Sequence, residues 1–365
     1  MRRIIIYVSV LATLSGFSLQ CTNPTSDMPQ SNFQPTWESL AGWQVPVWFE
    51  DAVLGFYCHW GVYSVPGFAF LDPSERVDSG IWYGGAMYDP EDPSGVYNFH
   101  LQNYGDPCQF GYKDLVPLFR AENWSPDRWA SLYKEAGADF VGICAEHADG
   151  FPMWNSAIDL YNVNNYGQQR DVMADMYAAA RAQNMKTIAT FHEGPGSIYE
   201  GGRERCPDGV DVNDPAHADL YELSSKDELY NKLIEVIDNY QPDQMWFENA
   251  EDIYGLDRWR SFLAYYYNDA RSLGKEVVVT QKSTDPTLLS SSVLDIEGGE
   301  FPDGRWEWRG MTEPSERRWQ KDVPIGRYWV YAEGVGCRPV NMLVDGIVDR
   351  VSKNGVTLLD VAPKA

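Results

Sequence analysis

Short apolar runs alternate with amphipathic segments along most of the chain. The runs are nearly unbroken and rich in β-branched and aromatic residues, as buried parallel strands are. Three intervening segments, 125–137, 171–183 and 225–240, carry their apolar residues on one helical face. Strand and helix repeated in this order predict a parallel α/β fold with its helices outside. The six predicted strands are residues 53–58, 140–145, 187–191, 245–247, 277–280 and 293–296.

Each of these six runs ends in polar or ionisable residues. In a (β/α) barrel the carboxyl ends of the strands converge on one mouth, where active sites lie. The chain has no G-x-G-x-x-G or Walker motif, which argues against a nucleotide-binding sheet. We therefore predict a (β/α)8-like TIM barrel with its active site at the strand ends. The residues that follow or close the runs include His59, Glu146, His147, Asp149, His192, Glu248, Lys282 and Glu297.

Composition and charge narrow the class of ligand. Hydrophobic residues make up 44% of the chain, enough for a sizeable core, and aromatic residues make up 14%. Aromatic faces pack well on sugar rings, although large barrels also use them in their cores. The formal net charge of -24 repels nucleic acids and anionic membrane surfaces. A neutral substrate is therefore favoured, and no nucleic-acid partner is expected.

The first residues are typical of an export signal. Arg2 and Arg3 precede the apolar stretch 4–17, which is too short to span a membrane comfortably. Cys21 follows it, so we predict a signal peptide over 1–21 and a lipid anchor on Cys21 in the bacterial envelope or periplasm. Ser18 stands where lipoproteins usually have Leu, which leaves plain secretion as the alternative.

The leader is followed by the expected body of the protein. Residues 22–40 are predicted to form a tether, because their first part is rich in Ser, Thr, Asn and Pro. Residues 41–365 are predicted to form the catalytic barrel domain, without a C-terminal β-sandwich.

Beyond Cys21 the chain has an odd number of cysteines. Cys58 and Cys144 lie inside apolar runs and are expected to be core thiols. A bridge between Cys108 and Cys206 is compatible with export, but the sequence alone does not establish it.

The strand ends restrict the chemistry. No G-x-S-x-G or Cys-His pattern indicates an activated nucleophile. A metal site built from His59, His147, His192 and Asp149 lacks the H-x-H and H-E-x-x-H spacings, so we expect no metal and no other cofactor. Two carboxylates that flank a glycosidic bond remain, one to attack or activate water and one to donate a proton.

Several motifs occur in an order that resembles a known family. They are Trp48-Phe49-Glu50-Asp51-Ala52, His59-Trp60-Gly61-Val62-Tyr63-Ser64-Val65-Pro66, Trp82-Tyr83, His147-Ala148-Asp149-Gly150-Phe151, Arg170-Asp171, Trp246-Phe247, Trp319-Gln320-Lys321-Asp322 and Val351-Ser352-Lys353-Asn354-Gly355. As a set, from about Trp48 to Pro363, they resemble the family 29 α-L-fucosidases. The resemblance implies a retaining exo-glycosidase on a (β/α) barrel that releases terminal α-L-fucosyl or closely related residues.

The resemblance also implies roles for individual residues. Glu248 stands where the family has its nucleophile, the Asp of Trp-Phe-Asp. Glu297 is the first choice for the acid/base and Glu300 the second. Lys282 is interpreted as a structural ion pair at the rim. The expected sugar contacts are His59, Trp60, Trp82, His147, His192 and Trp246.

Three positions depart from the family pattern. Ile81 replaces a Glu, Ala148 replaces a His, and Glu248 replaces the nucleophilic Asp. The added methylene extends the carboxylate by about 1.5 Å, and lost polar partners change sugar specificity. We therefore keep two alternatives open: a glycosidase of the same fold with different sugar or endo specificity, and a non-catalytic carbohydrate-binding barrel.

Overall fold

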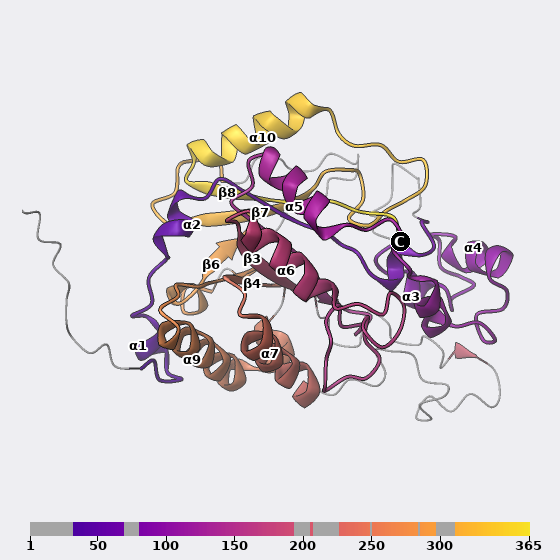
Figure 1. The fold of residues 1–365 in the computed structure, drawn as a ribbon, viewed down its shortest axis with the longest axis horizontal. Helices are drawn as coiled ribbons and strands as arrows, with labels where there is room; N and C mark the ends of the chain where they lie inside the picture. The colour runs from indigo at the N-terminus through magenta and orange to yellow at the C-terminus, as the bar shows by residue number, and fades with distance from the viewer. Residues whose placement is uncertain are drawn as a thin grey trace, which may run out of the picture. The chain divides into compact units, whose positions relative to one another are not determined.

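The computed structural model describes residues 32–68, 80–192, 205–206, 226–248, 250–283, 285–296 and 311–365 (Figure 1). The chain divides into two units, Met1–Asn32 and Phe33–Ala365. The barrel and its covering helices all belong to the second unit. The predicted signal peptide and Cys21 lie outside the described residues, as does most of the predicted tether.

Eight parallel strands close into a barrel in sequence order, which confirms the predicted TIM-barrel fold. Each strand pairs with the next, and β1 pairs with β8 to complete the ring. All six predicted strands are present. The strands are β1 Leu54–Tyr57, β2 Phe140–His147, β3 Lys186–His192, β4 Gln244–Phe247, β5 Val278–Gln281, β6 Val293–Asp295, β7 Trp319–Pro324 and β8 Gly355–Asp360.

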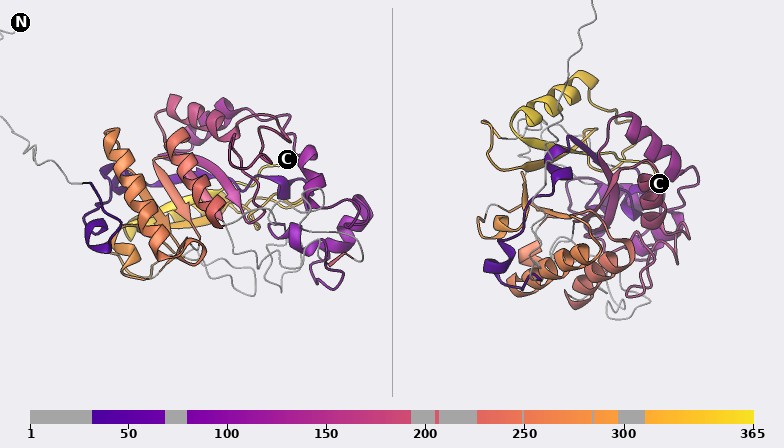
Figure 2. Two further views of the ribbon diagram at one scale, coloured as in Figure 1. Left: turned by 90° about the horizontal axis from the view of Figure 1, so that it is seen from below. Right: turned by 60° about the vertical axis from the view of Figure 1, so that its left-hand side comes forward.

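Helices cover the outside of the barrel (Figure 2). The three predicted helices are confirmed as α5, α6 and α7. Side chains cap two of them: Ser125 accepts from the backbone of Arg128, and Asp171 from that of Ala174. The helices are α1 Trp37–Leu40, α2 Val47–Asp51, α3 Tyr83–Ala86, α4 Val96–Asn103, α5 Pro126–Glu135, α6 Val172–Ala182, α7 Lys226–Tyr240, α8 Ala250–Tyr254, α9 Leu256–Ser272 and α10 Val340–Ser352, with short 3-10 turns η1 Val62–Ser64, η2 Tyr112–Leu118 and η6 Leu288–Ser290.

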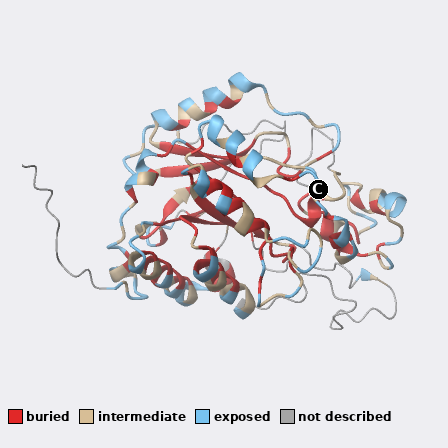
Figure 3. Cartoon of the chain, in the orientation of Figure 1, coloured by how far each residue is buried: buried red, intermediate tan, exposed pale blue. Residues whose placement is uncertain are grey.

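Burial follows this layered arrangement. The strands are buried along almost their whole length, whereas the longer helices turn exposed faces to solvent (Figure 3). Among the described residues, no helix combines the length and the apolar character that crossing a bilayer requires.

The strands β2 and β3 have an irregular register that matters for the site. Cys144 pairs with Thr190, but His147 pairs with His192, because the register shifts between Cys144 and Glu146. A bulge changes the alternation of side chains along the strand. Glu146 is paired with Lys232 of α7 at 2.9 Å, while His147 lies against His192 across the strand pair.

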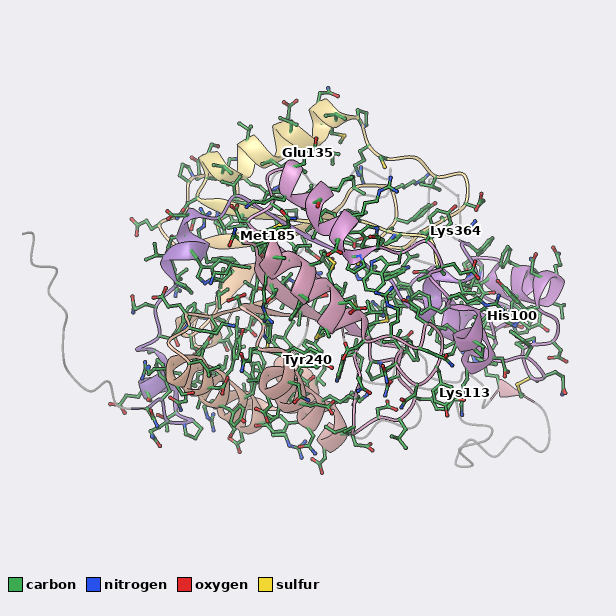
Figure 4. The ribbon with its side chains drawn as sticks, in the orientation of Figure 1. His100, Lys113, Glu135, Met185, Tyr240 and Lys364 are labelled. Carbon is green, nitrogen blue, oxygen red and sulfur yellow. A yellow bond between two sulfur atoms is a disulfide. The ribbon has the colours of Figure 1, made fainter. Side chains whose placement is uncertain are left out.

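Several segments that follow the strands gather at one end of the barrel. In Figure 4, His100, Lys113 and Lys364 lie on the side of the carboxyl ends, and Glu135 and Met185 lie towards the other end. A disulfide joins Cys108 to Cys206 across 98 residues of sequence, so the bridge that the sequence left open is present. Cys58 and Cys144 are free and buried, as expected for core thiols.

The compact unit begins earlier than the sequence predicts. It starts at Phe33, whereas the predicted barrel domain starts at Ala41. The Phe33 backbone N–H donates to Asn268 of α9 at 2.8 Å, and Leu40 is completely buried. These contacts make residues 33–40 part of the packed unit and not part of a tether.

Gly142 provides a test of how closely β2 and β3 are packed. A Cβ atom at this position would lie 1.8 Å from the backbone oxygen of Ile188. We expect Gly142→Ala to lower the free energy of unfolding by about 2–4 kcal/mol, measured by denaturant titration. Gly336 is the matched control, because a Cβ atom there would meet nothing within 4 Å. Equal stability of the two variants would contradict the close packing.

Candidate active site

Three imidazoles meet at the carboxyl ends of β1, β2 and β3. The ring centroids of His59 and His192 are 4.4 Å apart, and those of His147 and His192 are 5.2 Å apart and nearly parallel. Trp246 of β4 continues the group, with its ring 4.4 Å from that of His192. All four side chains are buried. The structure thus brings together four of the six predicted sugar-contacting residues.

Burial keeps these imidazoles neutral. It lowers the pKa of His59 and of His147 to about 3, and it lowers the pKa of His192 well below its usual range. The neighbouring imidazoles and Lys282 oppose protonation of His192 as well. A neutral imidazole has one N–H donor and one acceptor nitrogen, which suits it to bind hydroxyl groups.

Glu248 lies directly after β4, where the sequence places it. Its Oε1 atom accepts a hydrogen bond from the ammonium of Lys282 at 3.3 Å, and its Oε2 atom lies 3.8 Å from Nδ1 of His192. The Glu248 side chain keeps 31% of its surface exposed. A carboxylate held on two sides but open to solvent can still reach a ligand.

Lys282 is more than a surface ion pair. Its ammonium lies 3.6 Å from Asp322 Oδ2 as well as 3.3 Å from Glu248, and only 12% of its side chain is exposed. The ring of Trp246 lies 5.1 Å from the same ammonium. Burial disfavours the charged ammonium, but Asp322, Glu248 and Asp295 outweigh burial and raise its pKa. The interpretation of Lys282 as a rim residue is therefore incomplete.

Asp295, at the end of β6, connects this network to the barrel interior. It accepts a hydrogen bond from the indole N–H of Trp246 at 2.8 Å and another from the amide of Gln320 at 2.7 Å. Burial and the nearby Asp322 raise the pKa of Asp295 to about 7. The carboxyl group of Asp295 therefore fixes the orientation of the Trp246 ring at the base of the site.

Asp360, at the end of β8, holds His59. Its Oδ1 atom accepts the backbone N–H of His59 at 2.8 Å and lies 3.2 Å from Nδ1 of the imidazole. Within the part of the chain that the structure describes, neither ring nitrogen of His59 makes a well-aligned hydrogen bond, and the same holds for Nδ1 of His147. Buried polar atoms without partners indicate a binding site for a polar ligand.

The remaining predicted site residues lie in different places. Trp82 contacts the group, with its ring 5.6 Å from that of His147. Trp60 packs with Phe119, Trp124 and Trp129, a different set of rings from those around the histidines. Glu297 and Glu300 lie outside the described residues.

Four charged residues of the network were not predicted as site residues: Lys282, Asp295, Asp322 and Asp360. Each stands at or near the carboxyl end of a strand. The rule that identified Glu248, an ionisable residue directly after an apolar run, also applies to Asp360 after Leu358 and Leu359. It fails for Asp322, which lies within β7 beside other polar residues.

One group of side chains has donor atoms that suit a metal ion. Three possible ligand atoms lie within 4.8 Å of one another, one each from His59, Cys144 and His192. The metal site weighed from the sequence combines the two histidines with His147 and Asp149 and leaves out Cys144, which is expected in the core.

A closed parallel barrel with carboxylates and neutral imidazoles at its carboxyl ends has the arrangement of a TIM-barrel enzyme with its active site at that end. The sequence model described as "Alpha-L-fucosidase" matches residues 20–365. The chain belongs to the α-L-fucosidase family.

Individual relatives agree with this assignment at low identity. The plasma α-L-fucosidase of Homo sapiens is 28% identical over 343 residues, and the tissue α-L-fucosidase of Rattus norvegicus is 26% identical over 352 residues. Each alignment covers 91% of this chain and 66% of the relative, so the chain spans about two thirds of their length. The α-fucosidase of Thermotoga maritima in complex with fucose is 28% identical, with a TM-score of 0.70 over 91% of this chain and 72% of that one.

The neutral state of the histidines can be tested by titration. We expect His59 and His147 to stay neutral from pH 7 to pH 5, because burial holds each pKa near 3, below the ordinary 6.5. Their contribution to stability is complete above pH 6.5 and is lost as the pH falls towards 3. Imidazole NMR shifts, assigned with His59→Asn and His147→Asn variants, measure this. A midpoint near 6.5 for either ring would overturn it.

Proposed function

We propose that the protein is an exported retaining exo-glycosidase that removes terminal α-L-fucosyl or closely related residues from glycans. The observation that carries the proposal is Glu248, a partly exposed carboxylate held by Lys282 beside three neutral imidazoles and a buried tryptophan. Family membership supports the class of reaction, and the fucose bound to the Thermotoga maritima relative supports the class of sugar.

Glu248 would act as the nucleophile in a double displacement. Its carboxylate attacks the anomeric carbon and forms a glycosyl ester, while a second carboxylic acid protonates the departing glycosidic oxygen. The carboxylate left by that acid then removes a proton from water, which attacks the same carbon and releases the sugar with Glu248 as a free carboxylate. We assign the acid/base role to Glu297, with Glu300 as the second choice, from the sequence.

Lys282 supports both steps electrostatically. Its ammonium orients the Glu248 carboxylate for attack, and it stabilises that carboxylate again when the ester breaks. Glu248 is uncharged while it forms the ester and regains its negative charge when the ester breaks. The ammonium therefore lowers the activation barrier of the second step more than that of the first. Lys282 is a positioning residue, because it acts through Glu248.

The imidazoles and aromatic rings would bind the sugar. His59 and His147 present ring nitrogens that lack well-aligned partners in the described chain, and hydroxyl groups of a sugar can satisfy them. Trp246, fixed by Asp295, offers a rigid apolar surface to a sugar face or a methyl group.

A different terminal sugar is the second candidate. Ile81 is buried next to Trp82, and Ala148 follows His147, so two polar partners expected from the family are absent beside the imidazole group. Incubation with a panel of fucosylated and galactosylated glycans, followed by analysis of the products, distinguishes release of fucose from release of another sugar.

Export is part of the proposal. The Cys108–Cys206 disulfide supports it, because such bridges persist in oxidising compartments and are rare in the cytosol. The lipid anchor on Cys21 rests on the sequence of the leader alone. Labelling with a radioactive fatty acid in cells, lost in Cys21→Ala, tests the anchor.

Replacing Glu248 tests the proposed nucleophile. We expect Glu248→Gln to lower kcat/KM on an aryl α-L-fucoside by on the order of 10³-fold or more, because the amide cannot form the glycosyl ester. Glu122→Gln is the control, since the Glu122 side chain is 71% exposed in a surface ion pair. Release of fucose by Glu248→Gln at the wild-type rate would reject the assignment, and a folded wild-type protein that cleaves no glycoside would reject the activity.

Replacing Lys282 tests the electrostatic role. We expect Lys282→Met to lower kcat by about 10- to 100-fold, the effect of losing a hydrogen bond to a charged group. KM should fall as well, because slower breakdown lets the glycosyl ester accumulate, and mass spectrometry of the quenched enzyme should detect the ester. Lys282→Arg, which keeps the charge, should recover most of kcat. A rise in KM with unchanged kcat would instead assign Lys282 to substrate binding.

A further inference from the structure

A thiol and two imidazoles meet below the mouth of the barrel. One ligand atom from each of His59, Cys144 and His192 lies within 4.8 Å of the others, and all three residues are buried. They come from three adjacent strands or strand ends, so no local sequence motif marks the group. Cys144 pairs with Thr190, which stands two residues before His192 on the same strand.

A carboxylate lies behind each of the two imidazoles. Oδ1 of Asp360 is 3.2 Å from Nδ1 of His59, and Oε2 of Glu248 is 3.8 Å from Nδ1 of His192. Histidines that bind metals usually turn one ring nitrogen towards a carboxylate or carbonyl and use the other for the ion. Asp360 is the carboxylate placed nearest for this role, whereas Glu248 at 3.8 Å is beyond hydrogen-bond distance of His192.

The donor set selects the kind of ion. Two imidazole nitrogens and one sulfur suit Zn²⁺ and similarly soft cations, and they disfavour Mg²⁺ and Ca²⁺, which prefer oxygen. Both histidines are held in the neutral form that binds metals. The thiol of Cys144 is protonated, because burial raises its pKa, so a bound Zn²⁺ replaces the thiol proton and releases it to water.

The group needs only a small adjustment to close around an ion. Zinc binds nitrogen at about 2.0 Å and sulfur at about 2.3 Å, which places tetrahedral ligand atoms about 3.5 Å apart. Binding therefore requires the ligand atoms to converge by about 1 Å from their present spacing, with the thiol of Cys144 leaving the backbone oxygen of Glu146 at 3.5 Å. The hydroxyl of Thr190, now 3.0 Å from Nε2 of His192, is the group that such an ion would displace.

We propose that His59, Cys144 and His192 bind one Zn²⁺ ion, and that the bound ion inhibits the enzyme by occupying two of the imidazoles that would otherwise face the sugar. The binding half of the proposal stands by itself, whereas the inhibitory half rests on the proposed function. The ion is a regulator of the site and takes no part in the double displacement.

The binding experiment uses the full chain with Cys337→Ser, which removes an exposed thiol that could bind metal by itself. One equivalent of Co²⁺, a spectroscopic substitute for Zn²⁺, should give a sulfur-to-cobalt charge-transfer band that Zn²⁺ abolishes. Zinc X-ray absorption should show one sulfur and two imidazole nitrogens in the first shell. A shell of oxygen atoms only, or no binding at one equivalent, would overturn the proposal without the need for any further variant.

Two thiol variants locate the site. Cys144→Ser should lose the charge-transfer band and weaken Zn²⁺ binding by at least tenfold. Cys58→Ser is the matched control, since Cys58 is also buried and free and its backbone oxygen accepts the N–H of Cys144 at 3.0 Å. An unchanged band in Cys144→Ser, or its loss in Cys58→Ser alone, would contradict the assignment.

Hydrolysis of an aryl α-L-fucoside tests inhibition. Saturating Zn²⁺ should lower the rate at least tenfold, a chelator should restore it, and Cys144→Ser should keep its uninhibited rate at the same Zn²⁺ concentration. Binding without any hydrolysis by the metal-free protein would reject the proposed function but retain the metal site. Binding with an unchanged rate would reject the inhibitory half.

Discussion

The ammonium of Lys282 lies between Glu248 and Asp322, in a barrel mouth that also contains Asp295 and Asp360. Burial raises the pKa of a carboxylate, and neighbouring carboxylates add to the effect. Burial first, and then Asp322, raise the pKa of both Asp295 and Asp360. A buried cation offsets part of that repulsion where Glu248 reaches solvent. The geometry of the site therefore depends on Lys282 more than on any single hydrogen bond.

The neutral histidines follow from the same constraint. Nearby acids favour the imidazolium form of His59, yet burial outweighs them and lowers its pKa to about 3. Different residues therefore supply the charged groups and the neutral hydrogen-bonding groups of the site. Glu248 and Lys282 are the charged pair, and the imidazoles offer neutral donors and acceptors. An arrangement of this kind can bind an uncharged sugar beside one partly exposed carboxylate.

The strands and helices that have a clear local sequence pattern could be predicted from the sequence. Six strands appear as apolar runs, and Ser125 and Asp171 mark two helix starts. The strands β7 and β8 were covered only by the family motifs, because β7 contains the polar residues Gln320, Lys321 and Asp322 among its buried positions. These polar residues are buried because the barrel closes around them. The local pattern of apolar and polar positions in the sequence does not show that closure.

The site was predictable to the extent that strand ends identify it. His59, His147, His192, Glu248 and Trp246 follow from their positions and motifs. Trp60 shows the limit of carrying a motif over: successive side chains on an extended segment point to opposite sides, so its neighbour His59 joins the imidazoles while Trp60 packs elsewhere. The contacts of Lys282 link residues more than 30 positions apart, and no single stretch of sequence contains them.

The substitution of Glu for the family's Asp at position 248 can be understood within this network. The longer side chain brings the carboxylate within 3.3 Å of Lys282 and 3.8 Å of His192. Its extra length moves the reactive oxygens by about 1.5 Å, a displacement that matters when reacting atoms must lie about 3–3.5 Å apart. A sugar must therefore sit differently from one that meets an Asp, and the apolar Ile81 and small Ala148 change its surroundings near His147. The three departures are best explained together, as one pocket adjusted to the proposed nucleophile in a new place.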